Sequence, residues 1–471
     1  MNMKIRNFGP IKKADIDIAP LTIFVGPNSS GKSYSALLIH TLLNPFNKNS
    51  SKSQINLTMT PLEYLIENNE ELYNEFNREF IDYLDSSSEF SEVSFEFPKD
   101  KFDQLIFDGI GRYYRDSVEA KLKDNFNISL NDLNNIITNE SFNLKFNDIC
   151  LMNDNGNLII ENFSINTIMG FDEIDRKNRK LILSISRTNG NVLISLNPVA
   201  LNLTRIKNRF IPSIIYGIIS EIVIHSLTDN SYYLPTSSYT IAYNLNSILS
   251  REINGEGKSS KINKELMALL LKNNNIGEGF YKDIAIEMSK EIFGGVLEFK
   301  EDYSRIKFID LKNNVEFSFD SISSSIKELA PLIKYLADVS QINDTLIIEE
   351  PENHLHPKNQ RILVKYLVKL VNNGLNIILN THSDYMLEQF NNFIRLGEVD
   401  SKKLDDLNYS KENILNPSEI AIYNFKKDCD YQYIPELIDI NKTGFIDENF
   451  SKITDELYDE SVEIIDSMGG C

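Results

Sequence analysis

Apolar residues cluster at β-strand and helix spacing in two separate parts of the chain, at its start and in its last third. Residues 3–8, 13–19 and 21–25 have the short apolar or alternating pattern of β-strands. Residues 32–43 continue as a helix, which Pro45 ends. The start of the chain therefore predicts a piece of sheet followed by a covering helix.

Strands and helices alternate again after residue 294. Ile362, Tyr366 and Leu370 repeat at helical spacing and predict a helix with one buried face. The alternation predicts a mostly parallel sheet with helices on its faces. The predicted strands are near 296–300, 305–310, 314–319, 345–348, 376–380 and 419–425, and the predicted helices cover 324–340, 357–372, the segment after strand 376–380 and an acidic stretch from about 447.

The middle of the chain differs in character from both ends. Asparagine-rich linkers separate acidic helices, near 60–84 and 102–123, from hairpins that turn at 153–157 and 189–191. Longer helices are predicted near 198–227 and 260–291. The expected domains are the first part of an α/β domain at 1–45, a mainly helical insertion at 46–294 that offers a partner or dimer surface, the second part at 295–425, and a C-terminal strand and acidic helix at 426–471.

The segment GPNSSGKS connects strand 21–25 to helix 32–43. A strand, a glycine-rich loop and a helix in this order indicate the phosphate-binding loop of a nucleotide hydrolase. Gly26 and Gly31 let the backbone N–H groups turn toward an anion, and the helix adds its positive end. Lys32 would reach the β- and γ-phosphates, and Ser33 would ligate Mg²⁺. The predicted nucleotide contacts are Gly26, Pro27, Asn28, Ser29, Ser30, Gly31, Lys32, Ser33 and Tyr34; the alternative is a chance match to the pattern.

A second candidate site lies in TLIIEEPENHLHP, where an apolar strand ends in two carboxylates. Such a strand end is where α/β proteins bind ligands. Glu349 is assigned to the metal and Glu350 to the general base that activates water. His382, after the next apolar strand, would contact the γ-phosphate or the attacking water. A solvent-exposed Glu-Glu pair and a structural histidine are the alternatives.

Two further features have competing interpretations. His354 and His356 form an H-x-H pair, but without a cysteine or a third spaced ligand it is weak evidence for zinc. The run SISSSIKEL, residues 321–329, precedes a helix and is either an anion-binding helix end or an ordinary helix cap.

Composition and charge narrow the choice of partners. The formal net charge of −20 argues against binding of duplex DNA by the whole surface, although it leaves a local basic groove open. The apolar run at 211–224 is too short and too polar to span a bilayer. Cys150, Cys429 and Cys471 lie far apart, as expected of reduced thiols in a cytoplasmic protein, and Cys471 lacks the residues of a lipidation box.

The four motifs, in their order along the chain, resemble those of ABC-type ATPase heads. The similarity is strongest to the SMC-like branch typified by the overcoming-lysogenization-defect (OLD) family. It is carried by MKIRNFGPIKKADIDIAPLTIFVGPNSSGKS, SSSIKELAPL, LIIEEPENHLHPKNQ and NTHSDYML. The resemblance implies an α/β fold of the ABC-type P-loop ATPase class, with a mixed, mostly parallel sheet and a large mainly helical insertion.

The resemblance also implies a head-to-head dimer, or a higher oligomer, that holds two ATP molecules with Mg²⁺ at its interface. Ser323 would then contact the γ-phosphate bound by the other subunit, Glu350 would be the catalytic glutamate and His382 the switch histidine. Asn7 and Phe8 correspond to residues near the base and ribose. Three positions depart from the family pattern: Ser325 stands where signatures carry glycine, Glu349 where most heads carry aspartate, and Ser238 where the Y-L-P-A-x-R segment of OLD proteins carries arginine.

Full OLD proteins carry a C-terminal nuclease domain that this sequence does not display after His382. The resemblance is therefore to the ATPase subunits of antiphage systems such as Septu, PARIS and retron-linked modules, which act with a separately encoded nuclease or toxin. An ATP-bound scaffold with little turnover and a DNA-repair or chromosome-maintenance ATPase are the alternatives. A transporter ATPase fits the long insertion and the atypical signature poorly.

Overall fold

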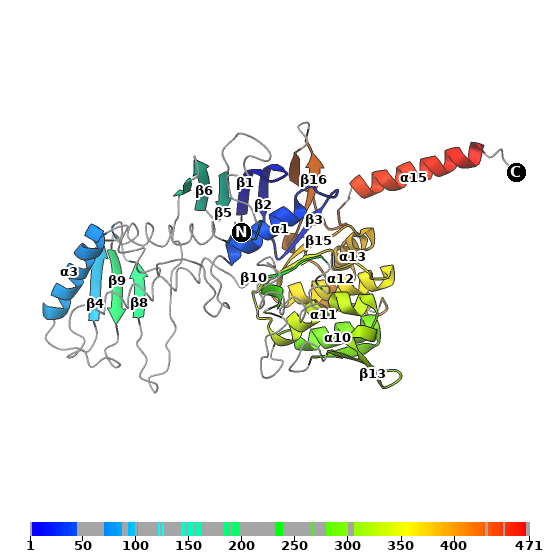
Figure 1. Cartoon of the computed structure of the whole chain (residues 1–471), viewed down its shortest axis with the longest axis horizontal. Helices are drawn as coiled ribbons and strands as arrows, with labels where there is room; N and C mark the ends of the chain where they lie inside the picture. The colour runs from blue at the N-terminus through cyan, green and yellow to red at the C-terminus, as the bar shows by residue number, and fades with distance from the viewer. Residues whose placement is uncertain are drawn as a thin grey trace, which may run out of the picture. The chain divides into compact units, whose positions relative to one another are not determined.

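The chain forms two compact units in the computed structural model (Figure 1). Unit 1 comprises Met1–Thr41, Asp124–Phe142 and Asn230–Cys471, and unit 2 comprises Leu42–Lys123 and Asn143–Asp229. The structure describes residues 2–44, 70–86, 93–98, 101, 121–122, 125–126, 143–146, 149–154, 157–161, 183–187, 191–196, 231–236, 238, 265–267, 269, 279–299, 306–407, 409–428, 432–445 and 448–467.

Unit 1 is built on a mixed sheet with the strand order β10-β14-β15-β3-β16-β17-β2-β1. Neighbours from β10 to β16 run parallel, whereas β17 is antiparallel to β16 and β1 is antiparallel to β2. The strands are β1 (Asn2–Phe8), β2 (Ile11–Asp17), β3 (Leu21–Val25), β10 (Ser231–Leu234), β14 (Thr345–Glu349), β15 (Asn376–Asn380), β16 (Ile420–Lys427) and β17 (Tyr433–Leu437). The predicted α/β class with a mostly parallel sheet is confirmed.

Strand β3 lies inside this sheet, and all five of its residues are buried. It pairs with β15 on one side and with β16 on the other. A continuous apolar sequence suits a strand that is covered on both faces. In the register, Glu349 pairs with Asn380, and Asn380 pairs with Phe24. The C-terminal ends of β14, β15 and β3 are therefore level at one edge of the sheet.

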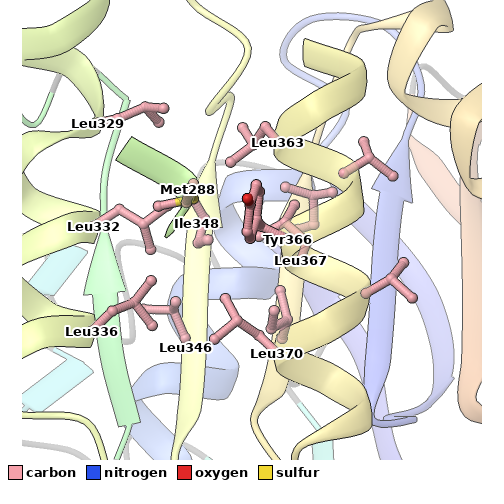
Figure 2. Packing of buried hydrophobic residues seen from close by; sticks show 14 of the residues in the cluster. Met288, Leu329, Leu332, Leu336, Leu346, Ile348, Leu363, Tyr366, Leu367 and Leu370 are labelled. Atoms are coloured by element: carbon pink, nitrogen blue, oxygen red, sulfur yellow. The ribbon is translucent and has the colours of Figure 1, made fainter. Parts of the chain in front are cut away.

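Unit 1 also contains the helices α1 (Lys32–Leu43), α10 (Lys282–Phe293), α11 (Ser324–Asp338), α12 (Pro357–Asn372) and α13 (Asp384–Arg395). Helix α10 packs against α11 and α12, and α12 packs against α13. In the core, Leu332 of α11 and Leu367 of α12 point toward Leu346 and Ile348 of β14 (Figure 2). The strand that ends in the two carboxylates is thus fixed by apolar packing.

A small antiparallel sheet of β11 (Gly295–Glu298), β12 (Lys307–Asp310) and β13 (Val315–Ser318) precedes α11. The C-terminal helix α15 (Glu448–Ser467) forms where an acidic helix was predicted. No helix in the described ranges is long and apolar enough to cross a membrane.

Unit 2 contributes one described helix, α3 (Glu70–Ser86), and two groups of antiparallel strands. In the first group β9 (Asn191–Leu196) pairs with β4 (Val93–Pro98) and with β8 (Leu183–Arg187). In the second, β6 (Ile149–Asp154) pairs with β5 (Asn143–Phe146) and β7 (Asn157–Glu161). Both predicted hairpins are therefore confirmed. The helix predicted at 198–227 and most of that at 102–123 lie outside the described residues.

The structure corrects one predicted element and adds two strands. The long helix predicted at 260–291 is wrong in its continuity, because residues 279–281 form a turn and α10 begins only at Lys282. A Cβ on Gly279 would lie 2.4 Å from the Leu336 carbonyl oxygen, so the chain passes close to α11 there. Strands β4 and β10 were not predicted; β10 has only four residues and β4 ends in a proline. Strand β17 lies within the segment 426–471, where a C-terminal strand was expected.

We expect Leu367→Ala to destabilise unit 1 by about 2–5 kcal/mol, because it empties space in the core between α12 and β14. Leu437→Ala is the matched control: Leu437 is 59% exposed, and its removal should change the free energy of unfolding by less than about 0.5 kcal/mol. Urea denaturation followed by circular dichroism measures both. Equal losses for the two variants would contradict this packing.

Candidate nucleotide-binding site

The loop between β3 and α1 has a backbone that two glycines make possible. Gly26 and Gly31 have φ angles of 132° and 104°, which side chains rarely tolerate. A Cβ on Gly31 would lie 2.8 Å from Ile11 Cγ1, and one on Gly26 would lie 2.9 Å from the Phe425 carbonyl oxygen. The loop is therefore held close to β2 and β16, and the first helical turn of α1 follows it directly.

The Lys32 side chain is buried and folds back across this loop. Its Nζ donates hydrogen bonds to the carbonyl oxygens of Gly26, at 2.9 Å, and Pro27, at 2.8 Å. Burial lowers the pKa of Lys32 to about 8, although the nearby carboxylates of Glu350, Glu349 and Glu352 favour the charged form. A cation is thus held beside three acidic groups from the other motif.

A cavity of about 650 Å³ lies in front of the loop. Its walls bring the loop together with Glu350 and His382, which follow β14 and β15 in unit 1. The lining residues are Gly9, Pro10, Asn28, Ser29, Ser30, Gly31, Lys32, Ser33, Tyr34, Glu350, Asn380, His382 and Gln432. The two candidate sites of the sequence therefore face one cavity, whose volume suits a small-molecule ligand.

Glu349 is buried at the end of β14, and its carboxylate is held from several sides. Its Oε1 accepts a hydrogen bond from Asn380 Nδ2 at 3.0 Å, and its Oε2 lies 3.5 Å from the Thr236 hydroxyl, which donates to it. Burial, together with the charge of Glu349 and a hydrogen bond to it, raises the pKa of Tyr233 well above its ordinary value. Tyr233 therefore stays a neutral hydroxyl beside this carboxylate.

Glu350 has a left-handed backbone, with a φ of 46°. This conformation costs of order 1–3 kcal/mol for a residue with a side chain, and such strain concentrates at functional sites. The Glu350 N–H donates to the Asn380 carbonyl oxygen at 2.9 Å, and its Oε2 accepts from Asn353 Nδ2 at 3.1 Å. Its other oxygen, Oε1, lies 3.7 Å from His382 Nε2. The turn thus aims the carboxylate at the cavity and at the imidazole.

The electrostatics around His382 favour its neutral form. Burial and then the charge of Lys32 lower the pKa of His382 below its ordinary value of 6.5, and Glu350 opposes the shift only in part. A neutral imidazole at pH 7 can donate one hydrogen bond and accept another. The side chains of Glu350 and His382 are both about one-third exposed, at 33% and 32%, so a ligand in the cavity can reach them.

Four contacts of this site were not predicted from the sequence. Asn380 and Thr236 hold Glu349, Tyr233 lies beside it, and Glu352 accepts hydrogen bonds from the loop of His382. Asn380 was detectable in principle, because it ends the strand before His382 and so belongs to the same sheet edge. The other three contacts depend on how turns and an edge strand pack, and the local sequence carries no sign of that.

Other predicted site residues lie outside the cavity lining or cannot be placed. Ser323 is exposed and caps α11, where its Oγ accepts from Ile326 N–H at 3.4 Å and shares a hydrogen bond with Ser325. Phe8 is buried, edge-on to Tyr34, with ring centroids 6.1 Å apart. The side chain of Asn7 lies outside what the structure describes.

The structure also places His356, from the H-x-H pair considered for zinc, and Ser238. His356 caps α12, where its Nδ1 accepts from the Lys358 N–H at 3.2 Å. Within the described ranges no group of three or more His, Cys, Asp or Glu side chains could hold a metal ion, so the zinc interpretation of His354 and His356 gains no support. Ser238 is buried, at 4% exposure, and its side chain carries no charge.

Three features define an α/β nucleotide-binding ATPase domain: the mostly parallel sheet, the glycine-rich loop after β3, and the carboxylates at the end of β14. The chain belongs to the AAA_15 family of AAA ATPase domains, whose model matches residues 1–387. The comparison with curated protein sequences yields no match.

The solved structures similar to this chain include three SMC heads. A crystal structure of an SMC head bound to the C-winged helix domain of ScpA is 14% identical, with a TM-score of 0.38 over 94% of this chain and 98% of that one. The SMC head domain from Thermotoga maritima is 12% identical, with a TM-score of 0.33 over 93% and 98%. An SMC head with an extended coiled coil, bound to the C-terminal domain of ScpA derived from Pyrococcus furiosus, is 12% identical, with a TM-score of 0.35 over 97% and 98%. These scores are low, so the fold assignment rests on the strand order and the family.

We expect the affinity for ATP to fall as the pH rises above about 8, because the free protein then loses the charge on Lys32. A bound polyphosphate stabilises the ammonium, so binding takes up a proton in this range, and Kd should rise by up to about tenfold per pH unit. Fluorescent-nucleotide titrations with EDTA, between about pH 7.5 and about pH 9.5, measure it. Lys32→Met should bind weakly at every pH. A wild-type Kd that stays constant over this range would contradict the lowered pKa.

Proposed function

We propose that this protein is an Mg²⁺-dependent ATP hydrolase in which the triphosphate of ATP lies on the loop 26–33. The observation that carries this proposal is the shared cavity, where Lys32, Glu350 and His382 meet. A cation for the phosphates and a carboxylate for a water molecule are the two groups that hydrolysis of a γ-phosphate needs. Membership of an ATPase family supports the same conclusion.

Each residue has a specific role in this proposal. Lys32 exchanges its hydrogen bonds with the loop carbonyls for contacts with the β- and γ-phosphate oxygens. Glu350 accepts the proton of the attacking water through Oε1, the oxygen that faces His382. His382, neutral at pH 7, donates a hydrogen bond to the γ-phosphate or orients that water.

The residues present fit a bound Mg²⁺ and a phosphate chain. Ser33 offers an exposed hydroxyl at the first turn of α1. Glu349 is buried outside the cavity lining, so its carboxylate would reach the ion directly or through a water molecule; these hard oxygen donors suit Mg²⁺, which keeps several waters. Ser30 Oγ and Asn380 Oδ1 are buried without a hydrogen-bond partner in the described part of the chain, and both residues line the cavity. When bound, the ion would neutralise phosphate charge, with Ser33 and Glu349 as its protein ligands.

The finer proposal is an ATP-dependent head-to-head dimer that controls a separately encoded nuclease or toxin in antiphage defence. Support comes from the resemblance of the four motifs to the OLD branch and from the exposure of Ser323. This serine is exposed at the N-terminal end of α11, and it does not line the cavity of its own chain. In the proposed dimer, the Ser323 hydroxyl would contact the γ-phosphate of the ATP that the second subunit binds.

A second candidate function, a scaffold that holds ATP with little turnover, is favoured by Ser325 and Ser238. Serine at these positions replaces the signature glycine and a potential cation. The amounts of intact ATP and ADP on the protein over several hours separate the two functions. Retained ATP without product favours the scaffold, and steady release of ADP favours the hydrolase.

We expect Glu350→Gln to keep ATP binding and to lower turnover by at least about a hundredfold, since glutamine cannot accept the proton. Lys32→Ala should lose nucleotide binding. Phosphate release and equilibrium dialysis with radiolabelled ATP measure the two properties. Turnover of Glu350→Gln at the wild-type rate would refute the assignment of the base.

We also expect Glu350→Gln with Mg-ATP to elute as a dimer, because the uncleaved γ-phosphate remains available to Ser323 of the second subunit. Adding Ser323→Glu should return it to a monomer, since a carboxylate repels the phosphate. Ser321→Glu, at an exposed serine two positions earlier, is the matched control. Light scattering after size exclusion measures the mass. Dimers that persist with Ser323→Glu would contradict the role of Ser323.

Co-expression of the protein with its neighbouring gene product tests the effector proposal. The size of any complex is measured with and without ATP.

A further inference from the structure

We propose that Glu352 is a positioning residue for His382. Its carboxylate ties the loop that follows β15 to the turn that follows β14, and so it sets the separation between His382 and Glu350. The inference deepens the proposed ATPase function and rests on it for the roles of Glu350 and His382.

The tie consists of two hydrogen bonds to one carboxylate oxygen. Glu352 Oε1 accepts from the Thr381 hydroxyl at 2.8 Å and from the His382 backbone N–H at 2.6 Å. The Thr381 hydroxyl oxygen accepts in turn from the Ser383 N–H at 3.1 Å. Three successive residues of the loop are therefore fixed, directly or through one atom, by a side chain from the other motif.

Burial strengthens these hydrogen bonds to Glu352. Glu352 is 8% exposed and Thr381 is fully buried, so water does not compete for these bonds. A hydrogen bond to a carboxylate in a poorly hydrated site is shorter and stronger than one between neutral groups. The backbone of His382 therefore has little freedom to shift relative to the turn that carries Glu350.

A second link runs parallel to the first and uses helix α12. Gln360 Nε2 donates to the Leu355 carbonyl oxygen at 2.9 Å, and the Ser383 hydroxyl donates to Gln360 Oε1. Ser383 also caps α13, where its Oγ accepts from the Met386 N–H at 3.2 Å. The turn after β14 and the start of α13 are thus joined on both sides of His382.

The chemistry of Glu352 argues for a role beyond stability. Burial raises the pKa of its carboxyl, so the fold pays a penalty for keeping the acid there. Its second oxygen, Oε2, is buried without a hydrogen-bond partner among the described residues. A buried acceptor without a hydrogen bond costs stability, which offsets part of what the two bonds to Oε1 contribute. What Glu352 does provide is the fixed position of the His382 amide.

That position matters because the imidazole and the base act on the same γ-phosphate and water. His382 Nε2 lies 3.7 Å from Glu350 Oε1 in the structure. A misplacement of about 1 Å in a catalytic arrangement can reduce the rate by about a hundredfold. Loss of the Glu352 tie should therefore lower the rate of hydrolysis while the loop 26–33 continues to bind ATP.

The test compares Glu352→Ala with two variants and one control. Glu352→Gln keeps an acceptor at Oε1, and Thr381→Val removes only one of the two bonds at similar volume. Asp344→Ala is the matched control, because Asp344 is a buried acid at the opposite end of β14. One oxygen of Asp344 likewise accepts two hydrogen bonds, from Tyr335 Oη at 3.1 Å and from the Gln341 N–H at 2.8 Å.

Two readouts are taken on the full chain. Hydrogen exchange of the peptide around residue 382, without nucleotide, should be at least about tenfold faster in Glu352→Ala and should be near wild type in Glu352→Gln and Asp344→Ala. With Mg-ATP, kcat should fall by about a hundredfold in Glu352→Ala with KM within about threefold of wild type. Thr381→Val should fall between Glu352→Ala and wild type. Glu352→Gln should recover kcat to within about threefold of wild type.

The outcomes separate this inference from the proposed function. If exchange near residue 382 is unchanged in Glu352→Ala, the positioning role is overturned, whatever the ATPase activity. If exchange accelerates while kcat is unchanged, the tie exists but does not serve hydrolysis, which also overturns the inference. If wild-type protein does not hydrolyse ATP, the proposed function fails, and the exchange result still decides whether Glu352 holds the His382 loop.

Discussion

The parallel pairing of β14, β15 and β3 is the constraint on which the site depends. The register of these strands pairs Glu349 with Asn380 and Asn380 with Phe24, so three chain segments end at the same level. From these ends the chain continues into the loop of Lys32, the turn of Glu350 and the loop of His382. Apolar packing of α11 and α12 on β14 fixes the register, because a one-residue slip would move Leu346 and Ile348 to the other face of the sheet and turn Thr345 and Glu349 toward these helices.

Charge balance at this sheet edge follows from that geometry. Lys32 is desolvated by the packing around α1, and three glutamates, one at the end of β14 and two in the turn that follows it, partly restore its preference for a charge. The same lysine helps to keep His382 neutral. The site therefore holds a cation of lowered pKa, the carboxylate of Glu350 and an uncharged imidazole within one cavity, a combination that suits an anionic ligand and proton transfer.

Backbone strain and close packing shape the two loops that carry these groups. Gly26 and Gly31 are required because a Cβ would meet Phe425 or Ile11, and Glu350 adopts a left-handed conformation despite its side chain. The strained turn is held by the Asn380 carbonyl oxygen and by Asn353. Such a turn places the Glu350 carboxylate at the cavity, whereas Glu349, one residue earlier, remains buried behind it.

The amino-acid sequence alone was enough to predict four features: the loop, the strand and helix on either side of it, the strand that ends in carboxylates, and the histidine after the next strand. Each is a local pattern of apolar periodicity, glycine placement and charge. The sequence also determined the membership of an α/β class, since alternating strands and helices require a parallel sheet. Two features became visible only in the folded chain: Thr236, Asn380 and Glu352 hold the functional groups, and the chain turns at residues 279–281 before α10. These contacts join segments far apart in the sequence, and their partners are fixed by strand register and side-chain packing, which no local pattern encodes.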